Sequence, residues 1–153
     1  MNVISLIKEV EDLDRQWCLA VKAEENRITG MTKLLPFPPP SSKARCDFND
    51  EDKAHYVART NAIKQLNGIY DEAKEHPDIV ALANKRDAVA RRVSDWIASN
   101  NCMIVGSVPG GLDCPKCGGK GISLPENGVN QRSMKAICES DNSHLISWVP
   151  WGG

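Results

Sequence analysis

The residues with the clearest chemistry in this chain are two cysteines separated by two residues, Cys114 and Cys117, followed at once by a glycine-rich stretch at 118–121. Two thiolates at this spacing can both reach one tetrahedral Zn²⁺ ion. The glycines allow the chain to fold back around the metal. We therefore expect residues 114–121 to supply two ligands of a zinc site.

These eight residues, CPKCGGKG, follow the pattern C-x-x-C-x-G-x-G. They resemble the repeats of DnaJ-type zinc modules and the knuckles of zinc ribbons generally. A DnaJ module uses four such repeats in pairs, whereas this chain has one. The resemblance covers eight of the 153 residues and implies one zinc-binding knuckle in a ribbon-like segment.

A structural zinc ion takes four protein ligands, so two more must come from elsewhere. Cys138 ends a predicted strand, where the second half of a ribbon site is expected. The best candidate for the fourth ligand is His144, at the start of the next predicted strand, and Cys102 is the alternative. Four protein ligands leave no open position for water, so one structural zinc is expected.

Three segments have the apolar spacing of amphipathic helices, at residues 2–28, 50–75 and 78–99. Residues 29–49 interrupt them with the proline-rich run LLPFPPPSS, which favours an extended crossover. In the second helix we expect an N-cap at Asn49 and a buried face. The expected members of that face are Tyr56, Ile63, Leu66, Tyr70 and Ala73.

After residue 101 the pattern changes to short β-like runs separated by turn residues. The runs are 102–105, 121–124, 134–138 and 144–149. We therefore expect an α+β fold in which an antiparallel three-helix bundle, residues 1–104, precedes a small β zinc ribbon, residues 105–153.

The composition is that of an ordinary globular protein, with 41% hydrophobic and 25% charged residues. Collagen-like and wholly disordered chains are excluded. No apolar run approaches the ~20 residues that a membrane helix needs. The N-terminus has no recognisable signal peptide, so we expect a cytosolic protein that does not contact a membrane.

The net charge is −1 and the pI is near 6.3, whereas dedicated nucleic-acid binders usually have a pI above ~9. Basic residues nevertheless recur in the C-terminal half, and tryptophans close the chain. The candidate partner-binding residues are Arg91, Arg92, Lys116, Lys120, Trp148 and Trp151. Clustering of the basic residues on one face would favour contact with phosphates.

Nucleotide-binding loops, zinc-protease motifs and nucleophile elbows are absent from the sequence, so we expect a protein that is not an enzyme and has no small-molecule substrate. The leading hypothesis is a binding protein that docks on a protein or nucleoprotein machine and regulates or inhibits it. In outline the chain is similar to zinc-bearing helical-hairpin regulators of bacterial RNA polymerase and to small phage-encoded inhibitors of CRISPR effector complexes. The alternative is a nucleic-acid-binding zinc-ribbon module.

Overall fold

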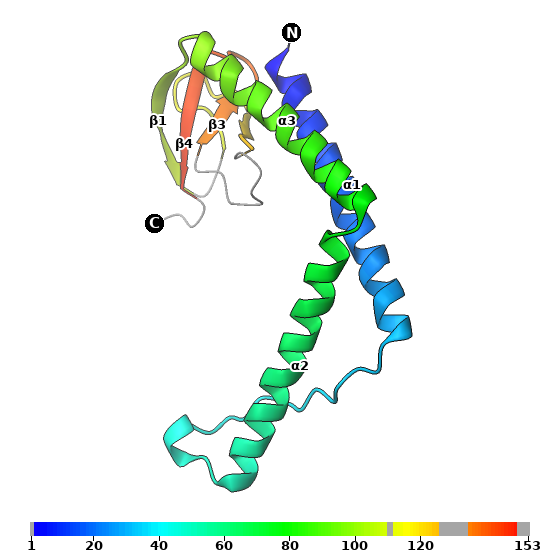
Figure 1. Cartoon of the computed structure of the whole chain (residues 1–153). Coiled ribbons are helices and arrows are strands. Elements are labelled where there is room, and N and C mark those ends of the chain that lie inside the picture. Colours follow the sequence, from blue (N-terminus) through cyan, green and yellow to red (C-terminus); the bar gives the residue numbers. More distant parts are fainter. Residues whose placement is uncertain (1, 110–111, 126–134, 150–153) are drawn as a thin grey trace. The chain divides into compact units, whose positions relative to one another are not determined.

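The structure is a computed structural model that describes residues 2–109, 112–125 and 135–149. Three long helices precede a four-stranded sheet within these residues, which confirms the predicted α+β class (Figure 1). In chain order the elements are α1 (Val3–Met31), the short 3₁₀ helix η1 (Arg45–Asp47), α2 (Asp50–Lys74), α3 (Pro77–Ser99), β1 (Met103–Pro109), β2 (Gly121–Ser123), β3 (Lys135–Cys138) and β4 (His144–Val149). Among the described residues, no helix is both long and apolar enough to cross a membrane.

The helix boundaries follow local signals in the sequence. Asn49 caps α2 in a reciprocal box, because its side chain accepts the Asp52 N–H at 2.8 Å while Asp52 accepts the Asn49 N–H at 3.0 Å. Helix α2 ends at Lys74 and α3 begins at Pro77, whose missing N–H costs nothing in a first turn. The predicted helix boundaries are therefore confirmed to within three residues.

The sheet has the strand order β1-β4-β3-β2. Strands β2, β3 and β4 pair antiparallel, whereas β1 runs parallel to β4. A register shift between Ile104 and Gly106 bends β1. The four strands were predicted, but nothing in their periodicity indicated that the first and last would be neighbours.

The chain divides into two compact units. The sheet unit comprises Met1–Gln16 and Ala81–Gly153, and the crossover unit comprises Trp17–Val80. Both units include a part of the long helix α1. The sequence analysis predicted a boundary between two domains at residues 104 and 105. The two compact units do not test whether those segments fold independently, so this boundary stays a prediction.

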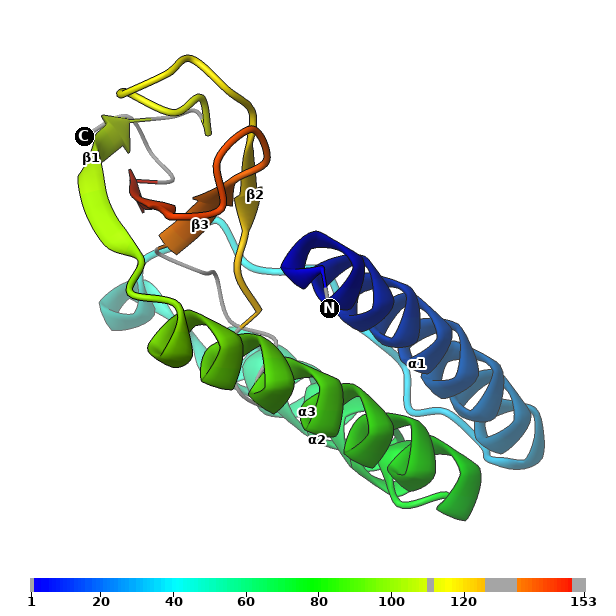
Figure 2. The same ribbon diagram turned by 90° about the horizontal axis from the view of Figure 1, so that it is seen from above.

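In the sheet unit, the start of α1 and most of α3 lie side by side, run in opposite directions and pack on the sheet (Figures 1 and 2). Their apolar stripes and the sheet enclose one core. Its buried members are Val3, Ile4, Leu6, Ile7, Val10, Leu13, Val89, Ala90, Val93, Leu124, Ile137 and Leu145. Arg86 on α3 pairs with Asp14 on α1 at 2.8 Å beside this core.

The crossover unit has a smaller core, formed by Val21, Ile28, Ile69, Ala73 and Ile79. The buried face expected for α2 is wrong at four of its five positions. Tyr56, Ile63, Leu66 and Tyr70 are 37–45% exposed, and of the expected set only Ala73 is buried. The buried face of α2 is instead formed by Ala62, Ile69 and Ala73. These three residues share one side of the helix because side chains three, four or seven positions apart lie on the same face.

The core of the sheet unit yields a stability prediction. Ile137→Ala should lower the free energy of unfolding by about 2–5 kcal/mol, because the side chain is fully buried and its removal leaves a cavity. Ile104→Ala is the matched control: Ile104 lies on the same sheet but is 61% exposed, so the loss should stay below about 1 kcal/mol. Denaturant unfolding measures both, and equal losses would contradict this description of the core.

Candidate metal centre

Four side chains meet at one end of the sheet: Cys114, Cys117, Cys138 and His144. One ligand atom from each lies within 4.8 Å of all the others. The Cys114 Sγ lies 3.6 Å from His144 Nδ1, and the Cys117 Sγ lies 3.4 Å from the Cys138 Sγ. The described structure therefore brings together all four residues predicted as metal ligands, close enough to hold one metal ion.

Backbone pairing positions these ligands. Cys138 ends β3 opposite Gly121 of β2, so it faces the loop that holds the first two cysteines. His144 begins β4 opposite Met103 of β1, whose N–H bonds the Ser143 carbonyl at 3.0 Å. The ligands thus come from the loop before β2, the end of β3 and the start of β4.

The loop from Cys114 to Gly119 closes on itself. The Cys114 N–H donates to the Gly119 carbonyl at 2.7 Å, and the Gly118 N–H donates to the Cys114 carbonyl at 2.8 Å. Gly118 has a φ of +73°, which favours glycine. A Cβ on Gly119 would lie 2.8 Å from the Cys138 Sγ and 2.5 Å from the Ser140 Oγ. Gly118 is therefore needed for its backbone conformation, and Gly119 is needed for the close approach to Cys138.

The cluster is largely shielded from water. Cys114, Cys138 and His144 are 3%, 0% and 6% exposed, and Cys117 lies at the surface. Cys114 and Cys138 belong to a small core with Ala136 and Ile146. A metal ion at this point would therefore have protein on most sides and solvent near one sulfur only.

Asp141 orients the histidine. Its Oδ2 lies 3.3 Å from His144 Nε2, while its Oδ1 accepts the Ser143 hydroxyl at 2.7 Å and the Ser143 N–H at 3.0 Å. These two hydrogen bonds from Ser143 lower the pKa of Asp141, so it remains a carboxylate. A carboxylate facing Nε2 favours the tautomer with its proton there and leaves the Nδ1 lone pair for a metal. The sequence analysis missed this residue, although its spacing of three from His144 was a usable signal.

The electrostatics of the thiols suit a bound cation. Burial disfavours the Cys114 thiolate, but hydrogen bonds from the backbone N–H groups of Lys116 and Cys117 and from the neighbouring ligand side chains outweigh it and lower its pKa to about 7. The Gly119 N–H favours the Cys117 thiolate, yet the adjacent sulfurs of Cys138 and Cys114 raise its pKa. Without a cation, the negative charge of the first thiolate therefore disfavours ionisation of the second thiol.

Cys102, the alternative fourth ligand, lies outside this group. Its Sγ contacts the Asn142 carbonyl at 3.3 Å, and burial raises the pKa of its thiol. The geometry therefore favours His144 over Cys102 as the fourth ligand.

The candidate partner-binding residues are distributed over the sheet unit. Arg91 and Arg92 are exposed on α3, and Lys116 and Lys120 are exposed on the loop that supplies the first two cysteines. Trp148 is half-buried on β4, and Trp151 lies outside the described residues. Their role in binding stays a prediction.

Comparison of the chain with protein-family models, with curated proteins and with solved structures gives no significant match. What the protein does must therefore be argued from its own residues.

The ligand assignment predicts a metal stoichiometry. Wild-type protein should contain about one metal ion per chain, and Cys114→Ser or Cys138→Ser should lose it, because a hydroxyl is a poor substitute for a thiolate. Elemental analysis of purified protein measures the content. Cys102→Ser is the control and should keep the metal. Loss of metal from that variant, or its retention in the other two, would contradict the assignment.

The position of Asp141 predicts an effect on affinity without loss of a ligand. Asp141→Asn should weaken metal binding by about 10- to 100-fold, because His144 loses the carboxylate that orients it. Competition with a chromophoric chelator measures the affinity. Asp113→Asn also removes an exposed carboxylate near the site and should leave the affinity unchanged. Equal effects of the two substitutions would indicate a general charge effect instead.

Proposed function

We propose that the metal is zinc and that its role is structural. The donor set of three thiolates and one imidazole is one that zinc prefers. Tetrahedral zinc, with bonds of about 2.3 Å to sulfur and 2.05 Å to nitrogen, separates sulfur from nitrogen by about 3.6 Å and two sulfurs by about 3.8 Å. The distances of 3.6 Å and 3.4 Å in the cluster are close to these values. Four protein ligands leave no position for a reacting water, which supports a protein that is not an enzyme at this site.

The zinc compensates for a sheet that is small. Strands β2 and β3 have three and four residues, at the short end of strand lengths, so few backbone hydrogen bonds hold this end of the sheet. The metal ties the loop before β2 to the end of β3 and the start of β4, and its binding free energy becomes folding free energy of this segment. Its three thiolates require a reducing compartment, in agreement with the expected cytosolic location.

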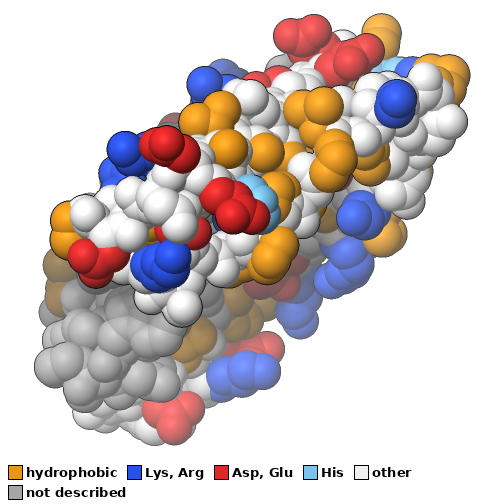
Figure 3. All heavy atoms as spheres, turned by 90° about the horizontal axis from the view of Figure 1, so that it is seen from below, with side chains coloured by type: hydrophobic (Ala, Val, Ile, Leu, Met, Phe, Trp, Pro, Cys, Tyr) orange, Lys and Arg blue, Asp and Glu red, His pale blue; other side chains and the backbone are white. Residues whose placement is uncertain are grey.

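The proposed function is binding to a protein or nucleoprotein machine, which the protein regulates or inhibits. The observation that supports it is the number of large apolar side chains at the surface of the crossover unit. They are Leu34, Leu35, Phe37, Tyr56, Val57, Ile63, Leu66 and Tyr70. Figure 3 shows hydrophobic side chains gathered among charged ones on one face of the molecule. Apolar side chains exposed together and rimmed by polar ones are typical of protein-binding sites, which supports the proposal.

This function predicts the result of a capture experiment. The tagged full-length chain should retain a stoichiometric protein partner from a bacterial lysate after nuclease treatment. Ile63→Gln combined with Leu66→Gln should reduce retention by about tenfold or more, because two apolar contacts are lost. Met103→Gln with Ile104→Gln changes two exposed apolar residues of the sheet unit and is the matched control.

The nuclease step separates this function from its alternative. Loss of every partner on nuclease treatment, with binding that weakens steeply as salt increases, would support the nucleic-acid-binding module instead. Equal retention by the two double variants would contradict a binding role for α2. Circular dichroism and metal content of each variant show whether the chain is still folded.

A further inference from the structure

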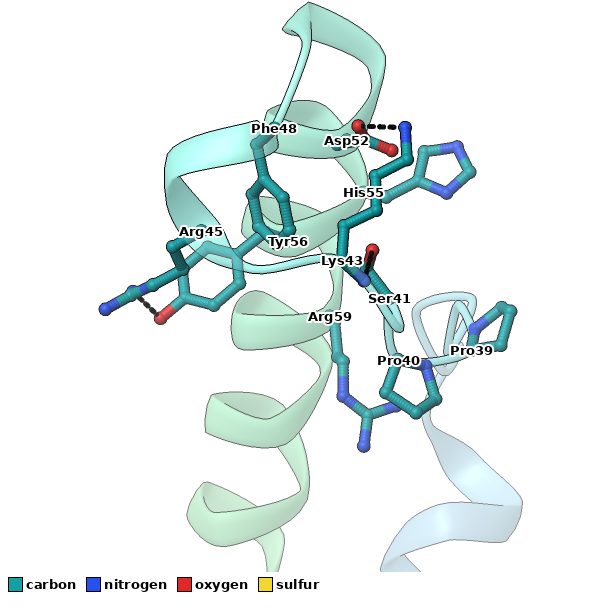
Figure 4. A pocket seen from close by; sticks show the side chains of 10 residues that line it. All are labelled: Pro39, Pro40, Ser41, Lys43, Arg45, Phe48, Asp52, His55, Tyr56 and Arg59. Atoms are coloured by element: carbon teal, nitrogen blue, oxygen red, sulfur yellow. Dashed lines mark hydrogen bonds and ion pairs between the residues drawn. The ribbon is translucent and has the colours of Figure 1, made fainter.

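The crossover unit contains a second candidate site, a surface pocket with a volume of about 450 Å³ between the proline-rich crossover and the first half of α2 (Figure 4). Its lining residues are Pro39, Pro40, Ser41, Lys43, Arg45, Phe48, Asp52, His55, Tyr56 and Arg59. This volume is within the range of ligand pockets in proteins. None of these residues belongs to the candidate metal centre.

The wall of the pocket is held in place by contacts between the crossover and α2. Arg59 donates to the Pro38 carbonyl at 3.0 Å, and its guanidinium lies 4.5 Å from the ring centre of Phe37. Gln65 donates to the Lys33 carbonyl and accepts the Leu35 N–H, at 3.0 and 2.9 Å. The extended prolines are therefore fastened along the helix, and the pocket is formed before any ligand binds.

The pocket has positive charge that the protein does not neutralise. Lys43 pairs with Asp52 at 2.9 Å. Arg45, by contrast, lies 4.5 Å over the ring of Tyr56 and donates to its hydroxyl, and the described partners of Arg59 are a carbonyl and a ring. Within the described chain neither guanidinium bonds a carboxylate, so two cations remain for an anionic ligand.

Four of the lining residues, Phe48, Tyr56, Pro39 and Pro40, give the pocket an apolar part beside its polar residues Ser41 and His55. The ring centres of Phe48 and Tyr56 are 6.2 Å apart and the rings are tilted at 55°, and Pro39 and Pro40 line the pocket from the crossover. Figure 4 shows side chains of α2 and of the crossover around this space. A ligand that fits has carboxylate or phosphate groups for the arginines and an apolar part for the rings.

The surroundings favour a peptide over a nucleic acid. Asp47, Asp50 and Glu51 are exposed beside the pocket and would repel a phosphate backbone that continued past it. From residue 17 to residue 80 the chain has nine Lys and Arg against ten Asp and Glu, so there is no excess of cations along which a polyanion could lie. A peptide needs only one or two anionic side chains at the pocket itself.

We propose that this pocket binds an acidic segment of a partner protein, with carboxylates on Arg45 and Arg59 and an apolar side chain against Phe48 and Tyr56. The inference rests on the proposed binding function and names the chemistry of the partner. Tyr56 also belongs to the exposed apolar face of α2, so a partner segment on that face reaches the pocket.

The test uses the full-length protein and synthetic probes, so it does not depend on capturing a partner. A short dye-labelled peptide with two Glu residues flanking a Leu should bind, and the backbone-amide NMR perturbations that it causes should map to residues 39–59. The same peptide with every Glu replaced by Gln should bind at least about tenfold more weakly, because the charge-assisted hydrogen bonds are lost. A thymidine oligonucleotide is the third probe.

Variants make the test specific for the two arginines. Arg45→Gln and Arg59→Gln should each weaken binding of the acidic peptide by about tenfold. Arg59→Lys keeps the charge and should recover most of that loss, which separates charge from a damaged crossover. Lys64→Gln removes an exposed cation of the same helix outside the pocket and should change the affinity by less than about threefold.

Three outcomes would overturn the proposal: equal binding of the Glu and Gln peptides, binding of neither, or tighter binding of the oligonucleotide in this pocket. A partner captured from lysate together with failure of the peptide would leave the binding function standing and remove only this pocket. Failure of the capture together with specific peptide binding would leave the pocket standing as a site for acidic peptides and would count against the proposed docking on a bacterial protein.

Discussion

Three cysteine sulfurs and one imidazole nitrogen lie within 4.8 Å of one another in a largely buried position, and the arrangement of the sheet depends on their meeting. Thiolates this close repel one another and lack water, and a divalent cation between them removes both costs. Pairing of β3 with β2 and with β4 places these segments side by side, and the ligand cluster links the loop before β2, the end of β3 and the start of β4 at one point.

The two units differ in how much of their apolar surface they bury. In the sheet unit, α1 and α3 cover the sheet with a continuous core, and the candidate metal ligands lie beside a second small core. The crossover unit has a core of five buried residues and leaves much of its apolar surface exposed. A stable scaffold is thus combined with a region whose apolar surface is suited to burial against a partner.

The candidate sites differ in how much of their chemistry could be predicted. Cys114 and Cys117 are neighbours in sequence, so their spacing alone indicated a metal, and Cys138 and His144 followed from their places at strand ends. Asp141 was missed because its role depends on which histidine nitrogen faces the sulfurs. The crossover pocket was missed because the prolines of 39–40 and the arginine at 59 are brought together only when the crossover lies along α2.

The sequence by itself determined the three helices, the four strands, their succession along the chain and the residues of the metal cluster, because periodicity, caps and cysteine spacing are local properties. Only the tertiary structure decided that β1 lies parallel to β4 and that α2 packs through Ala62, Ile69 and Ala73. A helix with apolar residues over a wide arc does not specify which part of that arc is covered. Packing against α1 buries one side of α2. The apolar residues on the other side stay exposed, and these are the residues for which we propose a function.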